Sequence, residues 1–145
     1  SKQPYKQVNP YLFAEPISPH IAAGYAGVEI DLDLLASRYR AIKEAYDFVL
    51  VEGAGGWMTP VSDSLSMADL AIRLEIPILL VVGLKLGCLN HAQLTQKAIQ
   101  QSGLQLAGWI ANTLDPDMPY MQENIEFLSE HMDCPLLAHI PYKKD

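Results

Sequence analysis

The chain has 145 residues, a formal net charge of −7 and a pI of about 4.9. Because 50% of its residues are hydrophobic and 19% are charged, it has the composition of one compact globular domain. The acidic balance argues against non-specific binding to nucleic acid or to an anionic membrane, since both need basic patches.

The chain opens with an irregular segment. VNPYLFAEPISPH, residues 8–20, is rich in proline, and Ser18 and Pro19 at its end predict the cap and first position of a short helix. An apolar stripe over residues 31–46 then predicts a longer helix with Asp31 as its N-cap.

Short apolar runs alternate with helical patterns over the rest of the chain. The runs have the length and composition of strands buried on both faces, and they are residues 48–52, 77–82, 106–112 and 135–141. The further helices predicted are residues 66–75, which open on the capping-box-like SMAD, 90–102, which end at Gly103, and 119–131. This alternation predicts an α/β fold with a mostly parallel sheet and flanking helices.

Polar residues follow the predicted strands, at the position where ligands bind in open α/β sheets. Glu52 closes the first strand, and Gly53, Gly55 and Gly56 come after it. A rigidly held carboxylate beside glycines suits Mg²⁺ and phosphate, in the manner of a Walker-B acid. The alternative is an acid at a solvent-facing turn that the glycines form.

The ends of the later strands offer an anion site and a base-reading amide. GLKLGCLN, residues 83–90, leads into a helix that we expect to be capped near Asn90, and the free backbone N–H groups from Cys88 to Asn90 suit a carboxylate or phosphate. Asn112 closes the third strand, where its amide can read a base edge. Ordinary turn chemistry is the alternative at both places. Pro141 and Tyr142 follow the fourth strand.

Two cysteines, Cys88 and Cys134, lack metal-site spacing and are too few for a disulfide framework, which favours a reducing cytoplasm. The N-terminal SKQPYKQVNPY is too polar for a signal peptide, and the most apolar run, residues 76–84, is too short to span a membrane. We therefore expect a single domain over residues 1–145 that acts in the cytoplasm.

The motifs together resemble one enzyme family. VNPYLFAEPISPHIAA, VLVEGAGGWMTPVSDSLSMADLA, PILLVVGLKLGCLNHA, LAGWIAN and PLLAHIPY are similar to dethiobiotin synthetase, from about Val8 to Tyr142. The resemblance implies a P-loop NTPase fold of the nitrogenase iron protein type and an ATP- and Mg²⁺-dependent ligase of biotin biosynthesis. In that family 7,8-diaminopelargonic acid takes up CO₂ as a carbamate, ATP phosphorylates the carbamate, and the second amine closes the ureido ring.

The resemblance also implies roles for individual residues. Glu52 matches the magnesium-binding glutamate of the family. The nucleotide-binding set is Glu52, Gly53, Ala54, Gly55, Asn112, Pro141 and Tyr142. The loop that receives the substrate carboxylate, across the interface of a homodimer, is Gly87, Cys88, Leu89 and Asn90.

The chain departs from this family in its missing P-loop. It contains no GxxxxGK[ST], and it also lacks the family's KP-motif lysine and magnesium-binding aspartate. We expect no catalytic residue in this chain, no activity from it alone, and an uncovered sheet edge where the P-loop segment is missing. It is then a fragment or the partner of a separate chain. The alternatives are a noncatalytic regulatory or binding module of the same fold and another amide-forming ATPase, against which GCLNHA argues.

Overall fold

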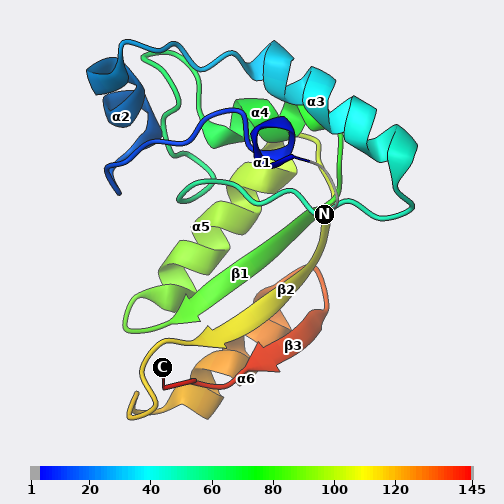
Figure 1. Cartoon of the computed structure of the whole chain (residues 1–145). Helices are drawn as coiled ribbons and strands as arrows, with labels where there is room; N and C mark the ends of the chain where they lie inside the picture. The colour runs from blue at the N-terminus through cyan, green and yellow to red at the C-terminus, as the bar shows by residue number, and fades with distance from the viewer. Residues whose placement is uncertain (1–3, 145) are drawn as a thin grey trace. The chain divides into compact units, whose positions relative to one another are not determined.

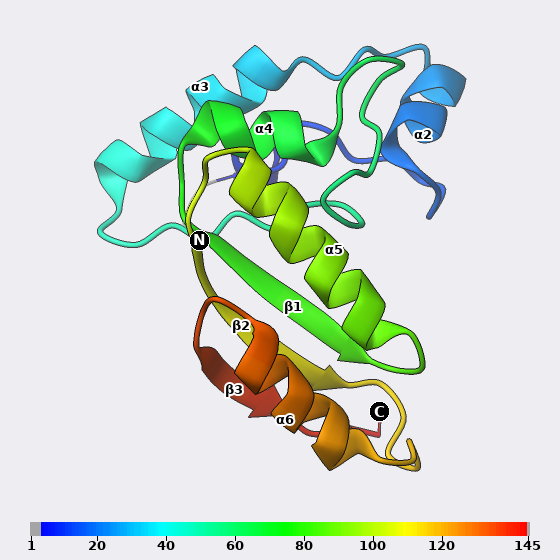
Figure 2. The same cartoon turned by 180° about the vertical axis from the view of Figure 1, so that it is seen from behind.

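The computed structural model describes residues 4–144 (Figures 1 and 2). The chain divides into two units, Ser1–Glu75 and Ile76–Asp145, and each is described by itself. The first unit carries helices α1 to α4, and the second alternates strands β1 to β3 with helices α5 and α6.

The first unit consists of helices joined by irregular segments. The helices are α1 (Tyr5–Val8), α2 (Pro19–Ala26), α3 (Leu32–Ala45) and α4 (Met67–Leu74). Helix α2 begins at Pro19 as predicted, although the Ser18 hydroxyl bonds the Nδ1 atom of His20 at 2.9 Å and makes no cap hydrogen bond. Helix α3 packs against α4, and Arg73 of α4 forms a salt bridge of 3.1 Å with Asp33 of α3.

Side-chain caps explain where α3 and α4 begin. The Asp31 carboxylate accepts from the backbone N–H groups of Asp33 and Leu34 at 2.8 and 3.1 Å. The hydroxyl and backbone N–H of Ser66 both donate to the Asp69 carboxylate at 2.7 Å, and these bonds hold the pKa of Asp69 below its ordinary value of 3.8. Both helices start where the sequence predicted because a polar side chain satisfies the first turn.

The strand predicted over residues 48–52 is wrong. The segment is irregular, and the side chains of Phe48 and Leu50 are 82% and 72% exposed. A strand is held by hydrogen bonds to a neighbouring strand, and no residue between 4 and 144 pairs with this segment. Its sequence therefore has strand character without the partner that strand formation requires.

The second unit is a parallel α/β sheet. Its strands are β1 (Ile78–Leu84), β2 (Leu106–Thr113) and β3 (Leu136–Ile140), hydrogen-bonded in the order β1–β2–β3. Helices α5 (Cys88–Gln101) and α6 (Met121–His131) connect them and cover the same face of the sheet (Figure 2). The predicted α/β class and parallel sheet are confirmed.

The register of the sheet shifts once in each strand pair, between Ile78 and Leu79 and between Trp109 and Ile110. Beyond these shifts Asn112 lies opposite Gly83 on one side and Ile140 on the other. Close approach also constrains β2, because a Cβ atom at Gly108 would lie 2.6 Å from Cδ1 of Leu137.

The core of the second unit lies between the sheet and its helices. Its buried residues are Val82, Leu84, Cys88, Ala92, Trp109, Ala111, Ile125, Leu128 and Met132. Alternation along β2 turns Trp109, Ala111 and Thr113 inward. Within residues 4–144, no helix combines the length and the apolar character that crossing a membrane would require.

Candidate functional site

The three parallel strands of the second unit end at one edge of the sheet, which we call the carboxyl edge (Figure 1). Gly87–Asn90 follows β1, Asn112 lies within the end of β2, and Pro141–Tyr142 follows β3. The fold therefore brings three predicted site segments together, at the position where ligands bind in sheets of this kind. Glu52 belongs to the first unit and is described by itself.

The anion site predicted after β1 is smaller than expected. Gly87, with a φ of 93°, is the N-cap of α5, so the helix begins at Cys88 and the predicted cap near Asn90 is wrong. The Cys88 N–H donates to the Lys85 carbonyl at 2.9 Å and is not free. The N–H groups of Leu89 and Asn90 have no acceptor among the described residues, which leaves these two donors for an anion at the helix N-terminus.

The Cys88 side chain belongs to the core and not to the ligand-facing surface. It is 2% exposed, and its Sγ atom lies 3.9 Å from Oδ1 of Asn124 in α6. The other free thiol, Cys134, is half-buried, and burial together with the Asp133 carboxylate raises its pKa. Cys88 thus contributes to this segment by anchoring the first turn of α5, while Asn90 is exposed.

Asn112 is positioned by strands on both sides. Its sheet neighbours are Gly83 in β1 and Ile140 in β3. The half-buried side-chain amide has no hydrogen-bond partner among the described residues, so its two donors and its acceptor remain available to a ligand. Pro141 and Tyr142 are exposed and come directly after the residue that pairs with Asn112.

Sequence reasoning missed two residues at the carboxyl edge. The Oγ1 atom of Thr113 lies 2.8 Å from Nε2 of His139 and 3.6 Å from Sδ of Met121 in α6. The two residues are far apart in the chain, and only the register of β2 and β3 brings them together. The available signal was their position near the ends of consecutive strands, where Thr113 directly follows Asn112 and His139 lies two residues before Pro141.

Glu52 and its glycines form an exposed loop in the first unit. Gly53, Ala54 and Gly55 are exposed along with Glu52. Thr59 closes the loop, because its Oγ1 atom accepts from the Gly56 N–H at 2.7 Å. Gly55 has a φ of 73°, and a Cβ atom there would lie 2.5 Å from Thr59 Oγ1, so this turn requires glycine.

The donors near Glu52 limit how a metal ion would bind. Within residues 4–144, no group of three or more His, Cys, Asp or Glu side chains gathers to hold a metal. Mg²⁺ is ordinarily held by one or two carboxylates together with substrate phosphates and water. The exposed Glu52 carboxylate fits this mode as a single protein ligand.

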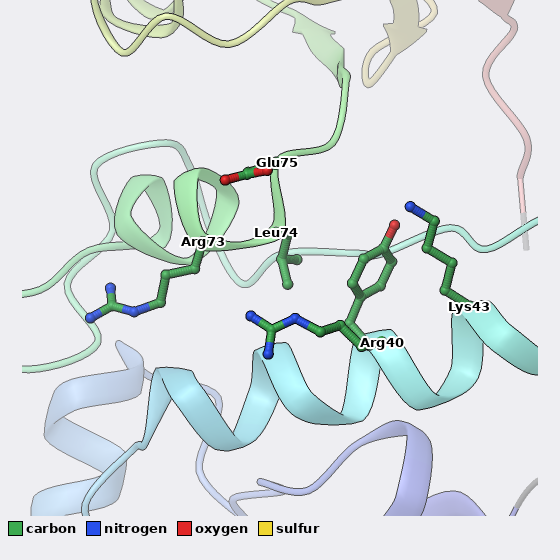
Figure 3. Close-up of a pocket in the computed structure, with 6 residues that line it drawn as sticks. Arg40, Lys43, Arg73, Leu74 and Glu75 are labelled. Atoms are coloured by element: carbon green, nitrogen blue, oxygen red, sulfur yellow. The ribbon is translucent and has the colours of Figure 1, made fainter.

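The first unit also contains a basic recess, which is separate from the predicted site residues. Figure 3 shows Arg40 reaching from α3 toward Leu74 of α4. Arg73 is paired with Asp33, and the Lys43 ammonium lies 5.9 Å from the centre of the Tyr39 ring. The lining residues are Tyr39, Arg40, Lys43, Arg73, Leu74 and Glu75, which include none of the predicted site residues.

Comparison with known proteins identifies relatives of the chain. The family model described as AAA domain matches residues 1–145. The ATP-dependent dethiobiotin synthetase BioD of Nitrosospira multiformis is 44% identical over 97% of this chain and 62% of its own length. BioD 1 of Escherichia coli O157:H7 is 48% identical over 95% of this chain and 61% of its own length. The ATP-dependent dethiobiotin synthetase BioD of Vibrio parahaemolyticus is 49% identical over 95% of this chain and 60% of its own length.

The relatives confirm the resemblance to dethiobiotin synthetase that the motifs predicted. The chain spans about 60% of the length of the curated relatives it matches. The family match and the parallel sheet confirm an α/β fold of the P-loop NTPase type. The chain belongs to the AAA domain family.

Proposed function

We propose that the protein to which this chain belongs is an ATP-dependent dethiobiotin synthetase. The names of relatives that match 95–97% of the chain support this proposal. One amine of 7,8-diaminopelargonic acid adds to CO₂ and gives a carbamate. A carbamate oxygen takes the γ-phosphoryl group of ATP, releasing ADP. The second amine then attacks the carbamate carbon, a C–N bond forms, and the C–O bond to phosphate breaks.

The observation that carries the proposal is that polar segments follow all three parallel strands at the carboxyl edge, with Asn112 and Pro141–Tyr142 on neighbouring strands. The Leu89 and Asn90 N–H groups are donors for the substrate carboxylate, assisted by the α5 dipole. The Asn112 amide is suited to the adenine edge, and Pro141 and Tyr142 border the same place. In the homodimer proposed below, Asn112, Pro141 and Tyr142 hold the nucleotide of their own subunit. The Leu89 and Asn90 N–H groups hold the substrate carboxylate in the active site of the other subunit, so that each active site keeps two substrates in reacting geometry.

Glu52 is the proposed metal ligand of this chain. Its exposed carboxylate would hold Mg²⁺, which when bound neutralises charge on the nucleotide phosphates. Gly53, Ala54 and Gly55 leave the backbone open to a phosphate, because side chains there are small or absent. The P-loop that holds the remaining phosphates is not among these residues, so we place no catalytic group in the chain.

The proposal also covers the oligomeric state, the location and the partners of the enzyme. We propose a homodimer in which Gly87–Asn90 of one subunit reaches the active site of the other. We also propose that the enzyme acts in the cytoplasm, where Cys88 and Cys134 stay reduced. Its partners are then small molecules, and the net charge of −7 supports no nucleic-acid partner.

The test is product formation by a full-length protein that carries this chain after a P-loop segment. With ATP, Mg²⁺, diaminopelargonate and ¹³C-bicarbonate, we expect dethiobiotin labelled at the ureido carbonyl, measured by mass spectrometry. The 145 residues alone should give no product. ADP release without dethiobiotin would indicate another ATPase of the fold, and ATP binding without turnover would indicate a noncatalytic module.

A further inference from the structure

The contact between Thr113 and His139 is the one polar side-chain link between β2 and β3 among the described residues. Its oxygen–nitrogen distance is 2.8 Å, and Thr113 is 8% exposed. Neither residue belongs to the set to which the proposed reaction gives a role. We call this contact the Thr113–His139 bridge.

The bridge lies at the last rung of the sheet. Asn112 pairs with Ile140, and Thr113 is the final residue of β2. Pro141 follows Ile140 and has no N–H, so it cannot donate a further ladder hydrogen bond to β2. Thr113 therefore has no ladder partner in β3, whereas His139 pairs with Ala111 one position before Ile140, and the bridge joins these two residues diagonally.

Asn112 and the bridge lie on opposite faces of the sheet. Successive side chains of a strand alternate, so the Thr113 hydroxyl faces α6 and Met121 while the Asn112 amide faces away. The bridge therefore leaves the ligand-facing side open. At the same time it ties the residue after Asn112 to a residue just before Pro141.

Each polar atom of the bridge can have a hydrogen-bond partner. A hydroxyl carries one hydrogen, which Thr113 donates to the Met121 sulfur at 3.6 Å when the Nε2 atom of His139 donates to Oγ1 at 2.8 Å. Both the neutral Nε2–H tautomer and the protonated ring can donate in this way.

We propose that Thr113 and His139 are positioning residues that fix the spacing between Asn112 and the Pro141–Tyr142 segment, and with it the fit of the adenine base beside them. The proposal rests on the proposed nucleotide role of Asn112. A loosened bridge lets the segment after β3 move relative to the amide, so base contacts weaken. Groups that act on the diaminopelargonate are not touched.

The experiment compares Thr113→Val and His139→Leu, which remove the bridge, with Thr113→Ser and His139→Gln, which keep a hydroxyl and an Nε2 donor. In the full-length protein the first two should raise the KM for ATP about five- to tenfold, the effect of losing one hydrogen bond. The kcat at saturating ATP and the KM for diaminopelargonate should stay at wild-type values. In Thr113→Ser and His139→Gln the KM for ATP should stay within about twofold of the wild-type value, because the bridge is kept.

Matched controls and a double variant separate positioning from general destabilisation. Thr95→Val in α5 and His131→Leu in α6 make the same changes away from the bridge and should leave the KM for ATP unchanged. The double variant Thr113→Val/His139→Leu should be no worse than either single variant, since both remove the same contact. An unchanged KM for ATP in the bridge variants, or an equal rise in the controls, would overturn the proposal.

Calorimetric titration with ADP keeps this test apart from that of the proposed function. If the wild-type protein binds ADP but forms no dethiobiotin, the proposed reaction is wrong, and the bridge is judged by the same five- to tenfold loss of ADP affinity. If the wild-type protein binds no adenine nucleotide, both proposals are overturned. Loss of ADP affinity in Thr113→Val that Thr113→Ser restores supports the bridge.

Discussion

Asn112 in the second unit has a hydrogen-bonded strand on each side, whereas Glu52 in the first unit lies on a segment that no described residue pairs with. Both follow runs of apolar residues with the same strand-like composition. One run is buried in a sheet and the other leaves Phe48 and Leu50 exposed. The difference shows that the position of a polar residue at a strand end is set by the neighbouring strands and not by the strand's own sequence.

The largest expected effect is a loss of stability when a buried leucine of the second unit is replaced. An exposed leucine of the first unit is its matched comparison. In the 145-residue chain, Leu128→Ala should lower the free energy of unfolding by about 3 kcal/mol, because Leu128 is fully buried under the sheet. Leu50→Ala should lower it by less than about 0.5 kcal/mol, because that side chain is exposed. Urea titration followed by far-ultraviolet circular dichroism measures the unfolding of both units, because each contains helices. Similar losses from both substitutions would remove the contrast between the units.

Glu52→Gln tests whether an irregular segment can still hold a functional carboxylate. In the full-length protein we expect kcat to fall on the order of 100-fold, because a neutral amide no longer binds Mg²⁺ at the phosphates. Glu44→Gln, an exposed acid in the same unit, is the matched control. Turnover is measured at several Mg²⁺ concentrations. Equal turnover of Glu52→Gln and Glu44→Gln would exclude Glu52 from the mechanism.

Asn112→Ala probes the residue that the sheet holds firmly. Loss of a paired donor and acceptor at a base edge should raise the KM for ATP about tenfold, with kcat at saturating ATP near the wild-type value. Asn124→Ala serves as the control, because the side-chain amide of Asn124 in α6 donates to the carbonyl of Tyr120, the N-cap of that helix, away from the proposed base contact. If both substitutions change the KM for ATP equally, Asn112 has no special contact with the base.

The smallest effect concerns the capping box of α4. Ser66→Ala removes the hydroxyl that bonds Asp69 and should cost about 1 kcal/mol of unfolding free energy at neutral pH. Because the folded-state pKa of Asp69 is lowered, its stabilisation is complete above the ordinary value of 3.8 and is lost as pH falls through the folded-state pKa. The gap between Ser66→Ala and wild type should therefore narrow below pH 3.8. Ser64→Ala should have the same unfolding free energy as wild type. If the difference between Ser66→Ala and wild type does not change with pH, the hydrogen bond to the Asp69 carboxylate is not its cause.

Local chemistry made part of the fold predictable. Asp31 and Ser66 cap the helices that their positions indicated, because a cap depends on neighbours along the chain. The parallel direction of β1, β2 and β3 likewise follows from helix–strand alternation, and it predicted that Asn112 and Pro141 would lie at the same end of the sheet.

Contacts between distant segments could not be predicted in this way. Residues 48–52 have strand composition, but the sequence does not say whether a pairing strand is present. The start of α5 depended on Gly87 taking a positive φ and not on the Asn90 side chain. The Thr113–His139 bridge depends on a one-residue register shift between β2 and β3, which no local pattern encodes.

The close approach of β2 and β3 at Gly108 has a consequence for how such sequences diverge. The Leu137 side chain occupies the space where a Cβ atom at 108 would lie, and it is 56% exposed, so it can turn toward solvent to make room. Alanine at 108 therefore requires a different rotamer of Leu137. Substitutions at 108 and 137 are expected to have non-additive effects on stability, so the residue at one position limits what the other accepts.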